Sequence, residues 1–370
     1  MKTILFLIPT LGGGGAERVL VNLVNNMDKS RYKTTVQTLF DVGINKEYLS
    51  GDVEYIAGMK KQFIGYEKRY AQFSPTFLYS KIIKKKYDIV VSYLEGPTAR
   101  IVSGCCDAQT KLICWIHSEQ QTMQFAARSF CSVEEAENCY GKFDKIICVA
   151  ETVKADIESV FDLNVPTDVL YNINEDAEIR ARGNDSVPEN LYSNEINVVS
   201  VGRLIYEKGY DRLIRVHRKL LDEGMKHHVY ILGAGDKLAE LQRLATENKV
   251  SETFHFLGFV RNPYKYVSKA DLFVCSSRKE GFSTAVTEAL ILGIPVVSTN
   301  CSGAKELLGF DNDYGIVTEN SEQGIYNGLN KILSDAELLK YYKKQAVIRG
   351  KDFSKEKFVR AVEDMFENLY

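Results

Sequence analysis

Two glutamates in the second half of the chain, Glu280 and Glu288, stand eight residues apart in the stretch EGFSTAVTE. Ser283 between them is a suitable N-cap, because its hydroxyl can accept a hydrogen bond from a free amide at a helix start. A helix over Thr284–Leu292 would leave Glu288 only about 80° from the direction of Glu280. The two carboxylates could then flank one ligand where free helix amides favour a phosphate. A phosphorylated, polyhydroxylated ligand such as a nucleotide sugar has that chemistry. The alternative is two ordinary acids on a surface helix.

The elements on either side place this stretch at the edge of a sheet. Residues 271–276 (DLFVCS) are typical of a buried strand, and residues 294–299 (IPVVST) of the next one, with Gly293 as the helix C-cap between them. Strand, acidic loop, short helix and strand make a βαβ unit whose loop follows the carboxyl end of the first strand. Open parallel sheets bind their ligands at that edge.

A second candidate loop lies near the N-terminus. The apolar residues 4–9 predict a strand, Thr10–Gly15 (TLGGGG) the loop that leaves it, and Ala16–Met27 a helix with apolar residues at helical spacing. Glycines there would let the backbone approach a ligand closely. The loop does not match the dinucleotide fingerprint, because Glu17 occupies the third glycine position, and no Gly-Lys-Ser/Thr follows as in a phosphate-binding P-loop. The alternative is a turn without a ligand.

Strands alternating with helical segments along the whole chain predict an α/β protein with doubly wound parallel sheets. We expect two Rossmann-like domains that face each other across a cleft. The expected division is a first, acceptor-binding domain over residues 1–180, a polar linker over 181–195, and a second, donor-binding domain over 196–350. Residues 174–195 as a whole are the most linker-like stretch of the chain. A last helix over 351–370 would pack back on the first domain.

Composition limits the class of protein. A chain of 370 residues with 45% hydrophobic and 26% charged residues is typical of a soluble globular protein. The net charge of −2 argues against a nucleic-acid binder. The eight cysteines show no metal-ligand spacing, and those in apolar surroundings, such as Cys148 and Cys275, suggest a reducing compartment. No stretch has the roughly 18 apolar residues that span a bilayer. We therefore expect a cytoplasmic protein.

Residues 59–87 differ from the rest of the chain. They hold eight basic side chains and one acid, a charge of +7, together with seven aromatic residues. Basic and aromatic side chains together suit an anionic membrane surface, where each Lys or Arg contributes about 1 kcal/mol. This segment therefore predicts peripheral association with the inner face of the cell membrane. The alternatives are a solvated helix face with ordinary core aromatics and, less favoured, nucleic acid.

Several motifs, in their order and spacing, resemble the retaining glycosyltransferases of family 4, which have the GT-B fold. These motifs are GGGGAER at 12–18, VGRL with EKG at 201–209, ILGAGD at 231–236, FLG at 256–258, and EGFSTAVTE at 280–288, the E-x7-E element of that family. The resemblance covers nearly the whole chain. It implies transfer of a sugar from a nucleoside diphosphate, with uridine the commoner base, to a hydroxyl of a glycan or lipid-linked acceptor. Such an enzyme would build a cell-surface polysaccharide or glycolipid.

The resemblance also assigns roles to the second half of the chain. Arg203 and Lys208 would clamp the donor diphosphate, a role that suits a guanidinium fork and a point charge close together. Glu288 would accept hydrogen bonds from the ribose hydroxyls, and Glu280 would lie beside the transferred sugar. The remaining donor-binding residues would be Gly202, Gly281, Phe282 and Ser283. Glu306 is a weaker candidate for the same pocket.

In the first half, the resemblance places His117 near the donor sugar as a hydrogen-bonding group. A histidine at a strand end is otherwise a structural residue. Gly14 and Gly15 would line the phosphate or acceptor side of the cleft. Glu95 and Glu17 are weak candidates for binding the acceptor.

The implied reaction retains the anomeric configuration. A retaining glycosidase uses a carboxylate nucleophile about 5 Å from an acid, and the sequence shows no such nucleophile. The resemblance implies instead a front-face route in which the leaving diphosphate helps to deprotonate the acceptor. Positive side chains would stabilise that diphosphate, so no metal or other cofactor is expected, and the one DxD sequence, Asp311–Asp313, lies beyond the ligand-facing loops. A sugar-nucleotide epimerase and a non-catalytic sugar-nucleotide-binding protein are the alternatives.

Overall fold

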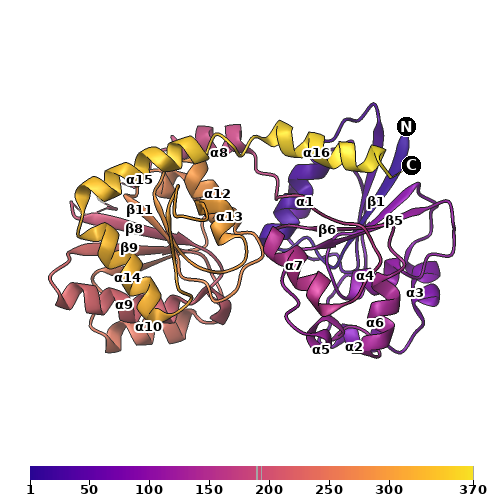
Figure 1. The fold of residues 1–370 in the computed structure, drawn as a ribbon, viewed down its shortest axis with the longest axis horizontal. Helices are drawn as coiled ribbons and strands as arrows, with labels where there is room; N and C mark the ends of the chain where they lie inside the picture. The colour runs from indigo at the N-terminus through magenta and orange to yellow at the C-terminus, as the bar shows by residue number, and fades with distance from the viewer. Residues whose placement is uncertain (189–190, 193, 370) are drawn as a thin grey trace. The chain divides into compact units, whose positions relative to one another are not determined.

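The computed structural model describes residues 1–188, 191–192 and 194–369. The chain divides into two compact units, the first made of residues 1–173 and 356–370 and the second of residues 174–355 (Figure 1). The first unit therefore ends before residue 180, the predicted limit of the first domain, and residues 174–180 belong to the second unit. Of the predicted linker, residues 189, 190 and 193 lie outside the described residues.

Seven parallel strands form the sheet of the first unit, in the order β3-β2-β1-β4-β5-β6-β7. They are β1 (Lys2–Ile8), β2 (Tyr32–Thr38), β3 (Glu54–Ile56), β4 (Ile89–Ser92), β5 (Lys111–Ile116), β6 (Lys145–Cys148) and β7 (Thr167–Val169). The central strands are apolar on both faces, since residues 4–8 and 89–91 are fully buried, as expected for a sheet covered by helices on both sides.

The helices of the first unit follow the strands as in a doubly wound fold. They are α1 (Gly15–Asn26), α2 (Tyr66–Tyr70), α3 (Pro75–Ile82), α4 (Pro97–Val102), α5 (Met123–Ala126), α6 (Val133–Tyr140) and α7 (Glu151–Val160), with a 3₁₀ turn η1 (Asn45–Tyr48). The predicted helix after the glycine loop is α1, which buries Val19, Leu20, Leu23 and Val24.

The last helix, α16 (Lys355–Glu367), lies against the first two strands (Figure 1). Phe366 is fully buried and its ring lies 6.2 Å from that of Phe6 and 6.1 Å from that of Tyr32. The hydroxyl of Tyr32 donates to the Glu367 carboxylate at 2.6 Å, and Lys2 forms an ion pair with the same carboxylate at 3.1 Å. The C-terminal helix therefore completes the core of the unit that holds the N-terminus.

Six parallel strands form the sheet of the second unit, in the order β10-β9-β8-β11-β12-β13. The strands are β8 (Ile196–Val201), β9 (His227–Leu232), β10 (Phe254–Gly258), β11 (Leu272–Cys275), β12 (Val296–Thr299) and β13 (Ile316–Thr318). The helices that follow them are α9 (Tyr210–Asp222), α10 (Leu238–Glu247), α11 (Tyr264–Val267), α12 (Thr284–Ile291), α13 (Ala304–Leu308), α14 (Glu322–Leu333) and α15 (Ala336–Arg349), with a 3₁₀ turn η2 (Tyr206–Lys208). The prediction of two doubly wound parallel-sheet domains is confirmed.

Each sheet has one place where the strand order reverses. In the first unit β1 and β4 are neighbours although β2 and β3 lie between them in sequence, and in the second unit the same holds for β8 and β11. At such a reversal, the connections that leave the two neighbouring strands run in opposite directions. The loops that follow the two strands therefore diverge, and a crevice opens between them at the carboxyl ends of the strands. The glycine loop follows β1, and the loops that carry Arg203, Lys208 and Glu280 follow β8 and β11.

The predicted linker over 174–195 is wrong at its start, because α8 (Asp176–Gly183) is a helix packed into the second unit. Its composition is polar, and Ile179 and Gly183 are its only buried residues. Arg180 attaches it to two other helices, since its guanidinium donates to the carbonyl of Ile291 at 2.6 Å and to that of Gly350 at 2.9 Å. These carbonyls end α12 and α15, where helices leave acceptors without partners. An apolar pattern does not reveal a helix that buries one large apolar residue and is otherwise attached through polar contacts, such as the hydrogen bond from the Ser268 hydroxyl to the Gly183 carbonyl at 2.5 Å.

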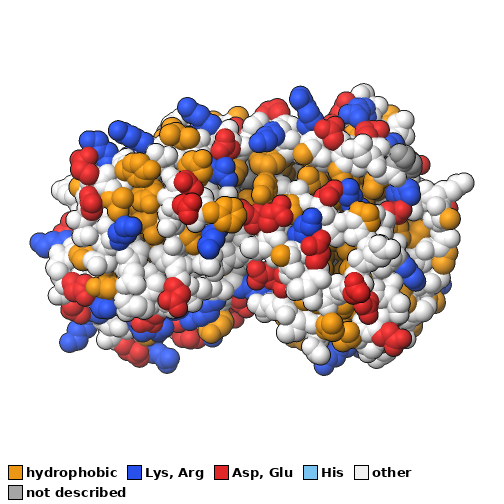
Figure 2. Space-filling model, viewed as in Figure 1, with side chains coloured by type: hydrophobic (Ala, Val, Ile, Leu, Met, Phe, Trp, Pro, Cys, Tyr) orange, Lys and Arg blue, Asp and Glu red, His pale blue; other side chains and the backbone are white. Residues whose placement is uncertain are grey.

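Acidic and basic side chains are interspersed over the face of the molecule that Figure 2 shows. The described helices include none long and apolar enough to cross a membrane.

A chain of hydrogen-bonded histidines ties α9 to β9 and to the start of β10. His227 Nδ1 lies 2.8 Å from the carbonyl oxygen of Met225, so this nitrogen carries a proton and donates it. His227 Nε2 then accepts from His217 Nδ1 at 2.8 Å, and His217 Nε2 accepts from the hydroxyl of Thr253 at 2.9 Å. Both imidazoles are fully buried. Burial, and then the neighbouring His227, lower the pKa of His217 to about 2, and burial also lowers the pKa of His227.

Acid should therefore destabilise the second unit. In the folded protein these two imidazoles stay neutral below the pKa of about 6.5 that they have in the unfolded chain. The unfolded state binds more protons as the pH falls below that value, so stability is lost over the same range. Between about pH 7.5 and pH 5.5, His217 should lower the free energy of unfolding by about 1.4 kcal/mol, and His227 should add to this loss. Urea unfolding followed by far-ultraviolet circular dichroism measures this loss.

The matched variant is His217→Asn, which removes one of the two titrating groups. Its loss of stability on acidification should be smaller than that of the wild type by about 1.4 kcal/mol. A free energy of unfolding that stays constant over this pH range, or a variant with the full wild-type loss, would contradict the assignment.

Candidate functional site

Lys208 and Glu280 meet at the carboxyl edge of the second sheet. Lys208 ends the 3₁₀ turn η2 after β8, and Glu280 lies in the loop after β11. Their Nζ and Oε1 atoms are 2.6 Å apart, and the two side chains are 20% and 12% exposed. The reversal of strand order brings these two loops together, because β8 and β11 are adjacent in the sheet. The structure thus places two of the predicted site residues in direct contact.

The surroundings of this ion pair are polar and closely packed. Ser277, which is buried, donates its hydroxyl to the same Glu280 oxygen at 2.6 Å. A cavity of about 10 Å³ lies beneath the pair, and Ser283 also lines it. Burial alone would lower the pKa of Lys208, but the negative charge of Glu280 outweighs it and the pKa is raised. Lys208 is therefore a permanently charged ammonium group at the crevice of this sheet.

Gly202 explains part of this packing. A Cβ atom at this position would come within 2.8 Å of the Tyr210 hydroxyl and 3.2 Å of Lys208 Cε. Only glycine leaves room for the lysine side chain to pass over the end of β8 towards Glu280.

Arg203 differs from Lys208 in having no partner. Its side chain is exposed and makes no hydrogen bond or ion pair with any residue that the structure describes. Since it directly follows Gly202, it stands at the same strand end as the ion pair. Its guanidinium fork is available to a ligand.

The helix after Glu280 begins as predicted, but its cap differs. Ser283 occupies the N-cap position of α12, yet its side chain makes no capping hydrogen bond. The predicted hydroxyl-to-amide bond is therefore wrong, and the first turn of α12 keeps amides for another acceptor. Phe282 is buried, and Gly303 lies against it and against the Gly281 carbonyl, so the loop is supported from the start of α13, the helix that carries Glu306.

Glu288 lies further along α12 and is half-buried. Its carboxylate accepts a hydrogen bond of 3.3 Å from the hydroxyl of Tyr264 on α11. It does not line the cavity beneath Lys208 and Glu280. The two glutamates of the E-x7-E element therefore occupy different surroundings.

In the first unit, the glycine loop leads directly into α1. Gly14 is the N-cap of this helix and Gly15 its first residue. The carboxylate of Glu17 folds back over the loop, so that a Cβ atom at Gly14 would lie 2.3 Å from Glu17 Oε2. A larger residue at this position would therefore have to displace the Glu17 carboxylate.

His117 and Glu95 also come together in the first unit. The Glu95 carboxylate accepts a hydrogen bond from the His117 amide at 2.9 Å and another from the Ser118 hydroxyl. The imidazole packs 4.8 Å from the ring of Tyr93, and its Nε2 atom is buried without a hydrogen-bond partner among the described residues. Burial lowers the pKa of His117 to about 4, although Glu95 opposes the shift. His117 is therefore neutral at pH 7.

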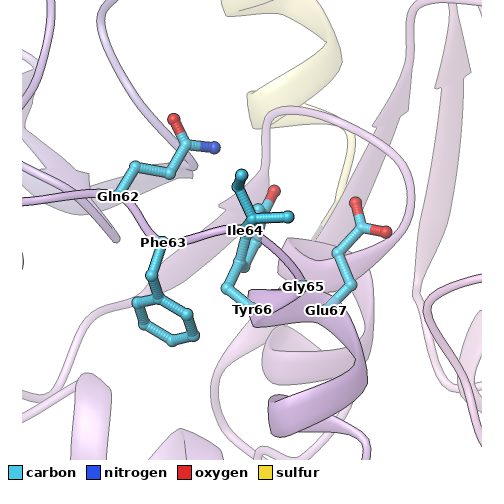
Figure 3. Close-up of a pocket in the computed structure, with 6 residues that line it drawn as sticks. All are labelled: Gln62, Phe63, Ile64, Gly65, Tyr66 and Glu67. Carbon is cyan, nitrogen blue, oxygen red and sulfur yellow. The ribbon is translucent and has the colours of Figure 1, made fainter.

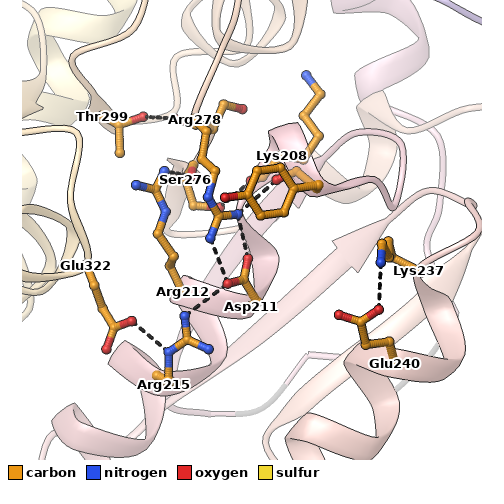
Figure 4. A network of polar contacts seen from close by, with 12 residues as sticks. Lys208, Asp211, Arg212, Arg215, Lys237, Glu240, Ser276, Arg278, Thr299 and Glu322 are labelled. Atoms are coloured by element: carbon orange, nitrogen blue, oxygen red, sulfur yellow. Dashed lines mark hydrogen bonds and ion pairs between the residues drawn. The ribbon is translucent and has the colours of Figure 1, made fainter.

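A network that the sequence analysis missed lies beside Lys208 (Figure 4). Arg278 and Asp211 form two parallel hydrogen bonds of 2.7 Å, and Arg215 also donates to Asp211 at 2.9 Å. The guanidiniums of Arg278 and Arg215 lower the pKa of Asp211 to about 2, although burial opposes them. Arg278 stands two residues before Glu280, and this closeness in sequence was the available signal.

Comparison with known proteins decides the family. The model "Glycosyltransferase Family 4" matches residues 13–173, and the model "Glycosyl transferases group 1" matches residues 182–349. The chain is a family 4 glycosyltransferase. Lys208, Glu280, His117, Gly14 and Gly15 all lie within the matched regions of this glycosyltransferase.

Two relatives come from Campylobacter jejuni. The N-acetylgalactosamine-N,N'-diacetylbacillosaminyl-diphospho-undecaprenol 4-alpha-N-acetylgalactosaminyltransferase is 39% identical over 165 residues, which cover 44% of each chain and so less than half of that relative. The GalNAc-alpha-(1->4)-GalNAc-alpha-(1->3)-diNAcBac-PP-undecaprenol alpha-1,4-N-acetyl-D-galactosaminyltransferase is 24% identical over 377 residues, with 99% of each chain covered.

Among solved structures, HepE from Anabaena in complex with UDP and glucose superposes with a TM-score of 0.81. It is 19% identical in sequence and covers 99% of this chain and 100% of its own. This similarity establishes that the glycosyltransferase has the GT-B fold.

Removal of the partner of Lys208 should lower stability. Glu280→Ala leaves a largely enclosed ammonium without its carboxylate, and we expect a loss of about 2 kcal/mol in the free energy of unfolding. Lys237 and Glu240 provide the matched control, since their ion pair has a similar distance of 2.7 Å but side chains that are 39% and 56% exposed. Glu240→Ala should cost less than about 0.5 kcal/mol.

A second substitution tests whether the unpaired charge of Lys208 causes this loss of stability. Lys208→Met in the Glu280→Ala background should recover most of the lost stability, because no unpaired charge remains. Urea unfolding at neutral pH measures all of these values. Equal losses for Glu280→Ala and Glu240→Ala would show that the Lys208–Glu280 pair contributes no more than a surface pair.

Proposed function

We propose that this glycosyltransferase moves a sugar from a UDP-sugar to a hydroxyl of a lipid-linked saccharide or glycan, with retention of configuration, in cell-surface polysaccharide or glycolipid synthesis. The names of the two Campylobacter relatives describe transfer to undecaprenol diphosphate-linked saccharides, which supports an acceptor of this kind. The complex of HepE with UDP and glucose supports uridine as the base.

The observation that carries the proposal is the charge arrangement at the crevice of the second sheet. Lys208 is charged and nearly enclosed, Arg203 is exposed and has no side-chain partner among the described residues, and the first turn of α12 has no side-chain cap. These three features supply a point charge, a guanidinium fork and free amides to one bound diphosphate. Positive charge there stabilises the leaving diphosphate as the glycosidic bond breaks. No metal ion is needed for that stabilisation, and we propose a metal-independent reaction.

The other residues of the second unit would hold the donor. Glu280 would share its carboxylate between Lys208 and the transferred sugar, and the Gly281, Phe282 and Ser283 amides would bind the sugar or the distal phosphate. Glu288 would accept from the ribose hydroxyls, with Tyr264 orienting its carboxylate.

In the first unit, the role proposed for His117 is hydrogen bonding to the donor sugar. A pKa of about 4 makes it a neutral group at pH 7, so it can position a hydroxyl but is a poor proton donor. Glu95 holds the backbone of His117 in place, a positioning role that its two hydrogen bonds support better than direct contact with the acceptor. Gly14, Gly15 and Glu17 would line the remaining part of the binding surface.

A panel of nucleotide sugars tests the function. The protein is incubated with UDP-glucose, UDP-galactose and their N-acetyl derivatives, with and without a chelator, and the release of UDP is measured. We expect slow release from at least one donor, equal in both conditions. Arg203→Ala and Lys208→Ala should each reduce the rate about 100-fold or more, because each removes a charge from the leaving group. With an acceptor, nuclear magnetic resonance of the product should show the anomeric configuration of the donor.

Other outcomes would contradict parts of the proposal. Interconversion of the donors without release would indicate an epimerase, and tight binding without release a binding protein. Loss of activity in the chelator would contradict metal independence. Near-normal rates in both Arg203→Ala and Lys208→Ala would show that these residues do not bind the diphosphate. An unchanged UDP affinity of Glu288→Ala in calorimetry would show that Glu288 does not bind the ribose.

We also propose that the first unit binds an anionic membrane surface through the basic and aromatic segment of residues 59–87. Its exposed apolar side chains are Met59, Ile64, Phe73 and Phe77, and its exposed lysines before β4 include Lys60, Lys61, Lys68 and Lys81. Ile64 is fully exposed beside a shallow hollow of about 400 Å³ formed by residues 62–67, and its side chain points away from that of Phe63 (Figure 3).

The end of the segment is different. Tyr87 is buried, Lys85 forms an ion pair with Glu54, and Lys86 forms an ion pair with Asp107. Residues 59–81 are therefore better suited to lipid than residues 82–87.

Sedimentation with vesicles tests this surface. Lys60→Gln/Lys61→Gln should weaken binding to phosphatidylglycerol vesicles by about tenfold or more, since each lysine near an anionic surface contributes about 1 kcal/mol. Lys85→Gln/Lys86→Gln removes the same charge from ion-paired positions and should have a smaller effect. Equal sedimentation of the wild type and both variants, or equal binding to phosphatidylcholine vesicles, would contradict the proposal.

A further inference from the structure

The turn that carries Lys208 is held by a side chain from another loop. Arg278, in the loop after β11, donates to the carbonyl oxygen of Tyr206 at 2.8 Å, and its guanidinium lies 4.0 Å from the centre of the Tyr206 ring. Its own amide donates to the carbonyl oxygen of Glu207 at 2.6 Å. Arg278 thus makes three contacts with the two residues that precede Lys208.

Asp211 fixes the position of Arg278. Both of its oxygens bind the Arg278 guanidinium at 2.7 Å, in the fork-to-fork geometry that makes an arginine–carboxylate pair directional. Asp211 stands in the first turn of α9 and is itself held by Arg215, whose Nε donates to Glu322 at 2.7 Å. Figure 4 shows this row of alternating charges leading from α14 to the turn of Lys208.

A second connection joins the same two loops. The Ser276 hydroxyl donates to the carbonyl oxygen of Lys208 at 2.9 Å, and Arg212 donates to the carbonyl oxygen of Ser276 at 2.7 Å. Gly209, at φ 65°, lies so close to this carbonyl that a Cβ atom would be 2.2 Å from it. The backbone on both sides of Lys208 is therefore fixed to the loop that leads to Glu280.

We infer that Asp211 and Arg278 are positioning residues for the donor diphosphate, acting through Lys208. A lysine side chain has four rotatable bonds and holds a ligand precisely only when its backbone is fixed. The turn η2 is a single 3₁₀ turn of three residues, which has little stability of its own. This inference rests on the proposed role of Lys208 in binding the diphosphate.

The charge of Asp211 allows a decisive test. Asp211→Asn removes a negative charge near the site, so a purely electrostatic effect would leave UDP affinity unchanged or increase it. Loss of the fork-to-fork pair would instead release Arg278 and the turn, and would weaken UDP binding. We expect affinity to fall about fivefold to tenfold in isothermal titration calorimetry. Asp222→Asn is the matched control, since Asp222 ends the same helix, pairs with Arg218 and makes no contact with the turn.

A double-mutant cycle with Lys208→Ala shows whether the effect passes through the lysine. The weakening caused by Asp211→Asn should largely disappear in the Lys208→Ala background, because the group that it positions is gone. Arg278→Lys, which keeps the charge but not the fork, should weaken binding less than Arg278→Ala. Circular dichroism confirms that each variant is folded at the assay temperature.

The outcomes separate this inference from the proposed function. If Lys208→Ala leaves UDP affinity unchanged, the diphosphate clamp itself is wrong. If Lys208→Ala weakens binding but Asp211→Asn does not, or if Asp211→Asn has its full effect without Lys208, the positioning role is overturned.

Discussion

The ion pair between Lys208 and Glu280 is the interaction on which the candidate donor site depends. An ammonium group that has lost most of its water needs a carboxylate at short distance, because burying an unpaired charge is costly. The pair satisfies that need within the protein itself, at a distance of 2.6 Å. Three neighbouring residues support this ion pair. Gly202 leaves space for the Lys208 side chain, and Ser277 donates a hydrogen bond to the Glu280 oxygen that contacts Lys208. Arg278 fixes the turn that carries Lys208. A bound diphosphate would join an arrangement of charges that already exists.

Parallel-sheet topology decides where such a pair can form. Lys208 and Glu280 are 72 residues apart in sequence and come from different strands. They meet because β8 and β11 are neighbours at the point where the order of the second sheet reverses. The first unit repeats the arrangement with β1 and β4, and places the glycine loop and Glu95 at the corresponding edge. The same reversal of strand order therefore produces the candidate binding surface of each unit.

Three sequence expectations changed for identifiable physical reasons. The helix α8 lies in the predicted linker because polar contacts, among them two from Arg180 to main-chain carbonyls, attach it with little apolar surface. Ser283 takes the N-cap position without capping, which leaves helix amides for a ligand. Two of the basic residues of 59–87, Lys85 and Lys86, pair with acids that are distant in sequence, so their charges are partly neutralised within the protein. Each outcome depends on contacts between distant residues, which a pattern of residue types does not contain.

The sequence by itself determined the alternation of strands and helices, the two parallel sheets, the family and the loops that carry Arg203, Lys208, Glu280 and His117. These follow from local apolar periodicity, glycine positions and motif spacing, all of which act over a few residues. Only the tertiary structure decided that Lys208 pairs with Glu280, that Glu288 turns to Tyr264, and that Arg278 and Asp211 hold the turn. Those choices depend on strand order and on which side chains can satisfy each other's charge in a crevice, and neither is encoded in any short stretch of the chain.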